Sequence, residues 1–259
     1  MKIAVVGKGG VGKTTLASLL ARIYAGEGRK VLAIDADPDA NLAAAIGLPQ
    51  ERLAEVKPIG AMKELAIERT GHGAGFGGLF KLNPTVDDLP DTLSVEYEGV
   101  KILALGCVER GGSGCFCPEH ALLRTLMNHI LVRRDDVVIM DMEAGVEHLG
   151  RATADAVDVM VIVVEPGQRS LDTAKQIERL ATDIGLKRIV YVGSKVDGPD
   201  DIAFLERSLP QERLLGMLSL DAEVRRADMD GRAPFEVGGK VLIEAKRIKE
   251  NLEQYRDGR

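Results

Sequence analysis

A short glycine-rich segment near the start of the chain combines backbone freedom with two lysines and a hydroxyl group. Residues 7–14 read GKGGVGKT, which matches the pattern G-x-x-x-x-G-K-[ST]. The glycines let consecutive backbone N–H groups point inward, where they can bind phosphate oxygens. The segment therefore predicts a nucleoside triphosphate site, with Lys13 at the outer phosphates and the Thr14 hydroxyl at Mg²⁺. The residues expected to bind the nucleotide here are Gly9, Gly10, Val11, Gly12, Lys13, Thr14 and Thr15.

The sequence on either side predicts the strand and the helix that position this loop. Residues 3–6 are apolar and β-prone, and apolar side chains recur at helical spacing over residues 16–23. A helix after the loop would add its positive end to the phosphate site. The loop also fits the weaker dinucleotide pattern G-x-G-x-x-G, with Asp35 as the ribose-binding acid. Lys13 and Thr14 favour the triphosphate, because a bulky cation and a metal-binding hydroxyl do not suit a tight pyrophosphate turn.

Two further apolar runs end in carboxylates. Residues 31–34 lead into Asp35 and Asp37, and residues 137–140 lead into Asp141. The carboxyl ends of parallel strands form the edge at which α/β sheets bind ligands. We therefore expect Asp141 to hold the water shell of Mg²⁺ and the first cluster to lie beside the nucleotide. A loop capped by acidic side chains, without chemistry, is the alternative for the first cluster.

The rest of the chain alternates strand and helix patterns. Residues 157–164 and 188–193 are apolar runs typical of buried strands, and residues 241–255 place apolar side chains on one helical stripe. Asp39 and Ser170 are expected to begin helices as caps. This alternation predicts an α/β, single-domain three-layer fold, with a mostly parallel seven- or eight-stranded sheet and helices on both faces.

Composition favours one domain spanning residues 1–259, although the length alone would allow two. Hydrophobic residues make up 45% of the chain and aromatic residues 3%, so the core must be aliphatic. The net charge of −6 argues against a general affinity for nucleic acid or for an anionic membrane. No leader precedes the first strand, the apolar runs are too short to span a bilayer, and three cysteines are no disulfide framework. A cytoplasmic, reducing setting is therefore expected.

Three cysteines lie close together in the middle of the chain. Cys115 and Cys117 form C-x-C between a glycine-rich stretch and a predicted helix. Two thiolates cannot close a tetrahedral metal shell, but a two-fold dimer would supply the other pair and give a shared four-sulfur site. A redox pair is the alternative, although its usual spacing is C-x-x-C. Cys107 is expected to be a small buried residue, and His120 either an auxiliary ligand or a residue of the first helical turn.

A second lysine early in the loop, Lys8, extends the resemblance beyond a phosphate-binding loop. The spelling GKGGVGKTT resembles the deviant Walker A loop of the MinD/ParA/nitrogenase-iron-protein class of P-loop ATPases. The resemblance implies that Lys8 reaches across a dimer to the partner's nucleotide. It also implies that residues 35–41 form switch I, in which Asp37 orients or activates the attacking water. Asn41 stands where some relatives have an acid.

The C-x-C pair and the stretch MDMEAGVEHL at residues 140–149 resemble a narrower family, the CooC-type nickel-insertion ATPases that mature carbon monoxide dehydrogenase. This resemblance implies Mg²⁺-dependent ATP hydrolysis and a homodimer formed with ATP or metal. It implies Ni²⁺, or Zn²⁺, bound by Cys115 and Cys117 of both subunits. The expected client is nickel-containing carbon monoxide dehydrogenase, or the related acetyl-CoA synthase, and neither nucleic acid nor membrane is an expected partner.

The nucleobase and the wider function keep alternatives. Ser194 and Lys195 follow a predicted strand and are expected to contact the base, where many relatives have Asn in place of Ser194. The stretch S-K-x-D also resembles the guanine-binding N-K-x-D of GTPases, so ATP is less firmly predicted than the phosphate site. A MinD/ParA-like positioning or partitioning ATPase and an iron–sulfur-bridged reductase remain the alternative functions. The acidic balance and the C-x-C pair argue against the first, and the adjacent cysteines differ from the separated cluster cysteines of the nitrogenase iron protein.

Overall fold

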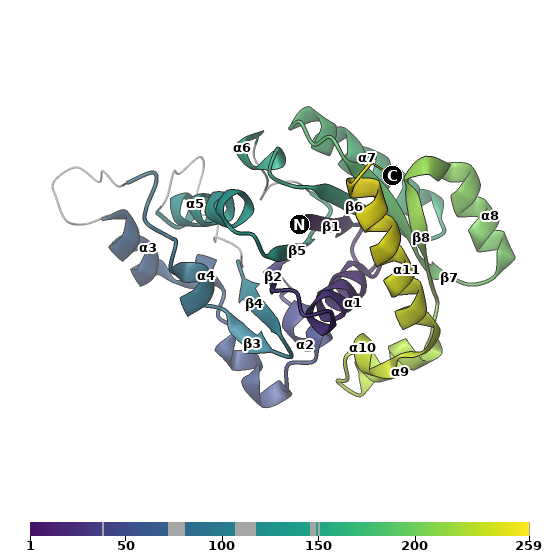
Figure 1. The fold of residues 1–259 in the computed structure, drawn as a ribbon, viewed down its shortest axis with the longest axis horizontal. Coiled ribbons are helices and arrows are strands. Elements are labelled where there is room, and N and C mark those ends of the chain that lie inside the picture. Colours follow the sequence, from purple (N-terminus) through teal and green to yellow (C-terminus); the bar gives the residue numbers. More distant parts are fainter. Residues whose placement is uncertain (38, 72–80, 107–117, 146–148, 150, 259) are drawn as a thin grey trace.

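The computed structural model describes residues 1–37, 39–71, 81–106, 118–145, 149 and 151–258. In these residues the strands form one eight-stranded sheet in the order β3-β4-β2-β5-β1-β6-β7-β8 (Figure 1). The strands are β1 (Lys2–Gly7), β2 (Val31–Ala36), β3 (Val95–Tyr97), β4 (Val100–Ala104), β5 (Val137–Met142), β6 (Val159–Val164), β7 (Ile189–Val196) and β8 (Leu214–Ser219). All pairings are parallel except that of β3 with β4. The predicted mostly parallel sheet is confirmed.

Helices connect the strands and cover the sheet. The α-helices of the described residues are α1 (Lys13–Gly26), α2 (Leu42–Ile46), α3 (Lys63–Thr70), α4 (Leu89–Thr92), α5 (Pro118–Arg133), α6 (Arg151–Ala154), α7 (Gln168–Asp183), α8 (Pro199–Ser208), α9 (Ala222–Met229), α10 (Pro234–Val237) and α11 (Gly239–Arg256). Short 3-10 helices span Gln50–Glu55, Ile59–Ala61 and Gln211–Arg213. Within the described ranges, no helix is long and apolar enough to cross a membrane.

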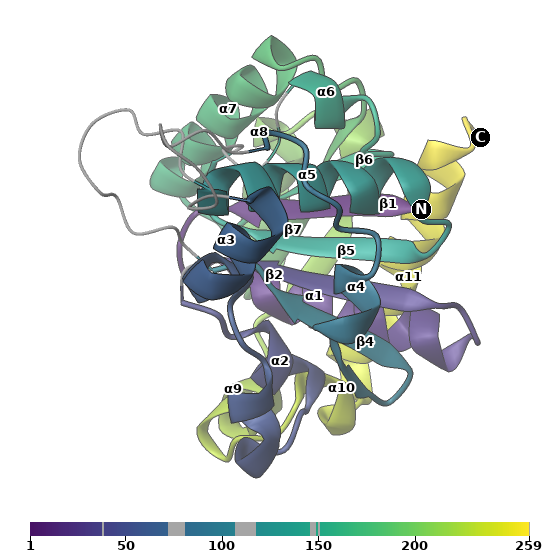
Figure 2. The same cartoon turned by 90° about the vertical axis from the view of Figure 1, so that its left-hand side faces the viewer.

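The two faces of the sheet have separate cores, because alternate side chains of a strand point to opposite faces. In β1, Ile3 and Val5 pack with apolar residues of α1 and α11, whereas Ala4 and Val6 pack with those of α5 and α7. Figure 1 shows these helix pairs on opposite sides of the strands, and Figure 2 shows α5 lying along one face. The expected three layers are therefore present, and the central strands β1, β2, β5 and β6 are buried along their whole length.

The register of the central strands brings the predicted chemical residues to one edge. Because β2, β5 and β1 are parallel, their carboxyl ends lie together. Asp35 of β2 is the register partner of Asp141 of β5, and Asp141 is also the partner of Val5 in β1. The glycine-rich loop leaves β1 two residues beyond Val5. Loop and carboxylates therefore meet without any unusual folding of the chain.

The short strand β3 was not expected from the sequence. The chain reverses between β3 and β4 at Glu98 and Gly99, whose φ values are 50° and 76°. Positive φ at both central residues is the geometry of the tight turns that suit twisted hairpins. The short antiparallel β3 covers the outer edge of β4. Its alternating pattern is too brief to predict as a strand.

Two expected helix caps are wrong. Helix α2 begins at Leu42, beyond Asp39, because the Leu42 N–H is bound by the Asp35 carboxylate at 2.8 Å. A side chain from a neighbouring strand thus does what a local cap was expected to do. Ser170 is the third residue of α7 and lies inside the helix.

Candidate nucleotide-binding site

The glycine-rich loop is held in a closed turn at the end of β1. The Val11 N–H donates to the Lys8 carbonyl oxygen at 3.2 Å. Gly12 precedes α1 with φ of 99°, and a Cβ atom there would lie 2.8 Å from the Ser194 hydroxyl oxygen. Only glycine combines this left-handed backbone with so close a neighbour. Helix α1 then begins at Lys13, so the loop and the positive helix end point to one place.

Lys13 lies where its sequence pattern requires a phosphate-binding cation. The residue is 6% exposed, and its Nζ lies 3.7 Å from Oδ2 of Asp37. The structure therefore brings together the lysine expected at the outer phosphates and the acid expected at the attacking water. Their segments follow β1 and β2, the two strands that flank β5, so a γ-phosphate bound by Lys13 would lie within reach of Asp37.

Thr14 and Asp141 form the second pair of the site. The Thr14 hydroxyl donates to Asp141 Oδ2 at 2.6 Å. Asp141 is 1% exposed, and its Oδ1 has no hydrogen-bond partner among the described residues. Burial, with smaller contributions from the Asp35 and Asp37 carboxylates, raises the pKa of Asp141 to about 7. A buried carboxylate with a free oxygen beside a hydroxyl fits Mg²⁺, which prefers hard oxygen ligands.

Asp35 has a function in the site that sequence reasoning missed. Its two carboxylate oxygens accept hydrogen bonds from the backbone N–H groups of Leu42, at 2.8 Å, and Asp37, at 3.2 Å. It is 2% exposed, and burial raises its pKa to about 6. One buried side chain thus fixes both ends of the loop that carries Asp37. The sequence signal that could have indicated this function is the spacing of the two acids, because Asp35 lies two residues before Asp37 at the end of a strand.

Lys8 makes a contact that the sequence did not predict. Its Nζ lies 3.1 Å from Oε1 of Glu165, which follows β6. The two side chains are 38% and 27% exposed. Lys8 therefore contacts its own subunit in this structure, while Gly9 and Gly10 beside it are exposed.

Ser194 and Lys195 both lie against the loop. Ser194 is 4% exposed and faces Gly12. Lys195 has φ of 55° and donates from Nζ to the Gly10 carbonyl oxygen at 2.5 Å. Non-glycine residues adopt this left-handed conformation uncommonly, and it turns the lysine back over the loop. Their expected contact with the base stays a prediction.

The predicted cysteine site lies outside the described residues, and this includes Cys107, Cys115 and Cys117. No cluster of three or more metal-ligating side chains occurs in the described part of the chain. His120 is the third residue of α5, which confirms the expectation of a first-turn helix residue. The metal site therefore stays a prediction.

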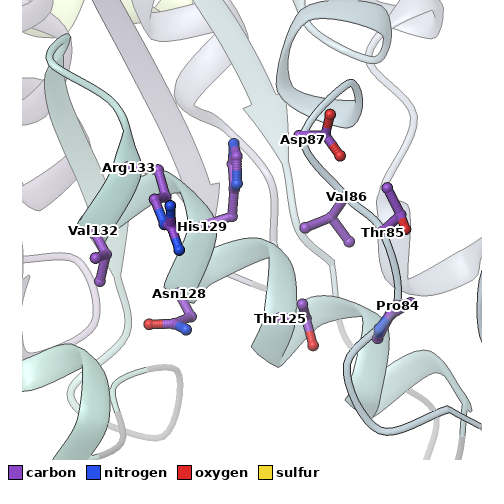
Figure 3. A pocket seen from close by; sticks show the side chains of 9 residues that line it. All are labelled: Pro84, Thr85, Val86, Asp87, Thr125, Asn128, His129, Val132 and Arg133. Atoms are coloured by element: carbon purple, nitrogen blue, oxygen red, sulfur yellow. The ribbon is translucent and has the colours of Figure 1, made fainter.

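A cavity of about 660 Å³ lies away from these residues, between residues 84–87 and helix α5 (Figure 3). Its lining includes Asp87, Thr125, His129 and Arg133. None of the predicted site residues lines it. The strand-end site, in contrast, unites residues of strands β2, β5 and β7, of the loops after β1 and β2, and of the start of helix α1.

Known proteins support the same assignment. Residues 2–235 match the family model described as the CobQ/CobB/MinD/ParA nucleotide binding domain. The chain belongs to this family. It is 52% identical to the carbon monoxide dehydrogenase accessory protein CooC of Rhodospirillum rubrum over 237 residues, which cover 92% of this chain and 90% of that protein. It is 42% identical to an uncharacterized ATP-binding protein of Methanocaldococcus jannaschii, with 96% of each chain covered.

Solved structures of the family share the fold. A chain of the MinC:MinD cell division protein complex of Aquifex aeolicus matches with a TM-score of 0.66 and 18% identity, covering 98% of this chain and 96% of that one. A plasmid partition protein of Borrelia burgdorferi bound to AMPPNP matches with a TM-score of 0.67 and 17% identity, covering 98% and 99%. The predicted membership of the MinD/ParA class of ATPases, with CooC-type similarity, is confirmed.

Proposed function

We propose that this protein is a Mg²⁺-dependent ATPase that switches between monomer and dimer and helps insert nickel into carbon monoxide dehydrogenase, or into the related acetyl-CoA synthase. The 52% identity to CooC over nearly the whole chain is the observation that carries the proposal. The buried Lys13 and Asp141 at one sheet edge, with the Thr14 hydroxyl bonded to Asp141, support the nucleotide half of it. The proposed setting is cytoplasmic, without nucleic acid or membrane as partners.

The chemistry assigned to the site is mostly positioning and charge stabilisation, as for other phosphoryl transfers. Lys13 would bind the outer phosphates, while Thr14 and Asp141 would hold Mg²⁺. When bound, the metal would supply positive charge that offsets the negative charge of the phosphates. Asp37 would orient a water molecule for attack on the γ-phosphorus. The water oxygen would bond to the γ-phosphorus as the bond between this phosphorus and the β–γ bridging oxygen breaks. The water's proton would pass to bulk solvent through the Asp37 carboxylate or the product phosphate.

Asp37→Ala tests this assignment. ATP should still bind, because Lys13 and the loop remain, but turnover should fall by about 100-fold, the low end of what a positioned proton acceptor contributes. Single-turnover hydrolysis separates this effect from binding. Asp39→Ala is the matched control, because Asp39 is an exposed acid of the same loop. Hydrolysis at the parent rate in Asp37→Ala would refute the role of Asp37.

Lys8 is proposed to act across the dimer interface on the partner's nucleotide. The Lys8 side chain is half-exposed at the start of the glycine-rich loop, which supports this role. The buried Lys13 is already placed to bind the phosphates of the nucleotide in its own subunit. Lys8→Ala should keep nucleotide affinity within a modest factor and lose ATP-dependent dimerisation. Hydrolysis should then no longer depend on protein concentration.

Nickel is the proposed cargo and would bind between subunits through Cys115 and Cys117. One Ni²⁺, or Zn²⁺ when nickel is scarce, should bind per dimer, and ATP should tighten its binding. Titration of the protein with Ni²⁺, with and without ATP, followed by size measurement, tests this. Cys115→Ser should abolish metal binding with ATP still bound, whereas Cys107→Ser should have little effect. A stoichiometry of one metal ion per monomer that persists when both Cys115 and Cys117 are replaced by serine would contradict a site shared between subunits.

The second candidate function is that of an ATP-dependent reductase with an iron–sulfur cluster bound between two subunits. The chain is 29% identical to the iron–sulfur ATP-binding protein of a light-independent protochlorophyllide reductase of Heliobacterium modesticaldum, over 92% of this chain and 78% of that protein. An absorption spectrum recorded without air distinguishes the candidates. A brown chromophore that is lost on removal of iron would support a reductase, and a nickel–thiolate band would support the chaperone.

A further inference from the structure

The fold places a carboxylate beside Lys8. Gly7 of β1 and Val163 of β6 are register partners, so Lys8 and Glu165 leave adjacent parallel strands at the same edge. The two strands are very close here, because a Cβ atom on Gly7 would lie 2.6 Å from the Val163 carbonyl oxygen. Lys8 and Glu165 meet at 3.1 Å. Strand register is therefore sufficient to explain the pair.

The backbones of Glu165 and Lys8 are both held in place, whereas their side chains meet each other. The Glu165 N–H donates to the Ser170 hydroxyl oxygen at 3.1 Å, and Ser170 is 3% exposed inside α7. The backbone of Lys8 is fixed by the turn to Val11, but no part of that turn involves the lysine side chain. Lys8 can therefore turn away from Glu165 while the phosphate-binding loop keeps its shape.

We propose that Glu165 is a positioning residue that holds Lys8 within its own subunit and competes for it with the nucleotide phosphates of a partner subunit. This inference rests on the proposed function, in which Lys8 crosses the dimer interface. The pair is half-exposed, so it is weak enough to open. A polyphosphate offers Lys8 several anionic oxygens in place of one carboxylate. Glu165 therefore raises the protein concentration at which ATP causes dimerisation.

The variant Glu165→Gln removes the negative charge and keeps the size of the side chain. An ion pair of this exposure changes an equilibrium by about two- to fivefold. Because a two-fold dimer opens the pair in both subunits, the dimer dissociation constant should fall by about 4- to 25-fold. Sedimentation with a non-hydrolysable ATP analogue measures this constant. The gain should shrink at high salt, which screens half-exposed charges.

Two variants control for effects outside the pair. Asp172→Asn removes an exposed carboxylate of α7 that accepts from Gln168 and contacts no lysine in the described structure, so it should leave dimerisation unchanged. Lys8→Ala/Glu165→Gln should dimerise no better than Lys8→Ala alone. Unchanged ADP affinity and thermal unfolding show that each variant is folded.

The outcomes separate this inference from the proposed function. Tighter dimerisation of Glu165→Gln that requires Lys8 supports the competition. Unchanged or weaker dimerisation, when Lys8→Ala does abolish the dimer, overturns only the assignment of Glu165. Normal ATP-dependent dimerisation of Lys8→Ala overturns the crossing role of Lys8, and the competition with it.

Discussion

Charged side chains gather at both ends of the parallel strands, and their surroundings differ between the two ends. At the amino end, Asp91 lies 2.6 Å from the Lys101 ammonium and 3.0 Å from the Arg134 guanidinium. These cations hold the pKa of Asp91 below its ordinary range. Lys2 donates from Nζ to the backbone carbonyl oxygens of Arg134 and Asp136. The amino end thus pairs its charged groups internally.

At the carboxyl end, two buried acidic groups accept hydrogen bonds from neutral donors but form no ion pair within the described residues. Asp35 and Asp141 are 2% and 1% exposed, and burial raises the pKa of each well above 3.8. Within the described residues, the cation paired with this group of acids is Lys13, whose Nζ lies 3.7 Å from Asp37 Oδ2. Buried carboxylates without cations destabilise a fold, so an arrangement of this kind indicates a site for an external cation and its ligand. Charged groups at the amino ends of the strands therefore stabilise the protein, whereas those at the carboxyl ends are suited to bind Mg²⁺ and a nucleotide.

Two buried lysines give the largest test of this contrast. Lys13→Ala should weaken ATP binding by about 100-fold, since a charge-assisted hydrogen bond of up to about 3 kcal/mol is lost. Lys2→Ala is the matched control at the amino end, because Lys2 is 7% exposed and Lys13 6%. Lys2→Ala should lower the unfolding temperature and leave ATP affinity unchanged. Titration with a fluorescent nucleotide and thermal unfolding measure both. Equal effects of the two variants on ATP affinity would break the contrast.

Asp141→Asn should change stability and function in opposite directions. In the parent protein the Thr14 hydroxyl lies 2.6 Å from Asp141 Oδ2. The asparagine amide would keep a carbonyl oxygen to accept this hydrogen bond, and the substitution would remove a buried negative charge. The nucleotide-free protein should therefore unfold at a higher temperature at pH 8. Hydrolysis with Mg²⁺ should fall by about 10- to 100-fold, because a charged metal ligand is lost. A variant that is both less stable and fully active would show that Asp141 is an ordinary structural acid.

The pH dependence of stability provides a third test. Folded-state pKa values of about 7 for Asp141 and about 6 for Asp35 lie above the ordinary 3.8, so between about pH 4 and 7 the folded protein binds more protons than the unfolded chain. The free energy of unfolding of the nucleotide-free protein should therefore fall as pH rises through that window. Bound Mg²⁺ and nucleotide should reduce the slope, because a cation favours the ionised carboxylates. Chemical denaturation at several pH values, with Asp141→Asn as control, measures it.

Much of this site was predictable because it follows from short sequence patterns and strand polarity. The loop pattern and the acids after apolar runs sufficed to place Lys13, Thr14 and Asp141 at one edge of a parallel sheet. Pairs set by register were not predictable. Lys8 meets Glu165 because Gly7 and Val163 are neighbours across two strands, far apart in sequence.

The functions of short polar side chains were also hard to predict. Asp35 resembles a ligand-binding acid in sequence, but in the structure it anchors the Asp37 loop and begins α2. Serine is a residue type that often caps helices, but the Ser170 hydroxyl instead accepts a hydrogen bond from the backbone N–H of Glu165. Such side chains accept from whichever N–H group the tertiary structure brings near, and local sequence does not contain that information.

Lys195 should have a moderate effect on the nucleotide site. Its bond to the Gly10 carbonyl oxygen, at 2.5 Å, steadies the loop from outside. Lys195→Met should raise the KM for ATP by about fivefold, the effect of about 1 kcal/mol, and change kcat little. Lys195→Arg should recover part of the loss. Equal KM increases for ATP and GTP would fit an action on the loop, whereas a change in their ratio would favour contact with the base.

The smallest effect is expected at the amino end of the strands. Asp91→Asn leaves Lys101 and Arg134 without their shared carboxylate, but the Asp91 side chain is 50% exposed, so the pairs contribute only about 0.5–1 kcal/mol to stability. The pKa of Asp91 is lowered in the folded protein, so its contribution is present above about pH 4 and disappears in acid. The parent and variant should therefore differ slightly in unfolding free energy at pH 7, and the difference should shrink progressively as the pH falls below about 4. ATP affinity and turnover should be the same in both, and a loss of activity without a loss of stability would mean that the amino end also takes part in nucleotide chemistry.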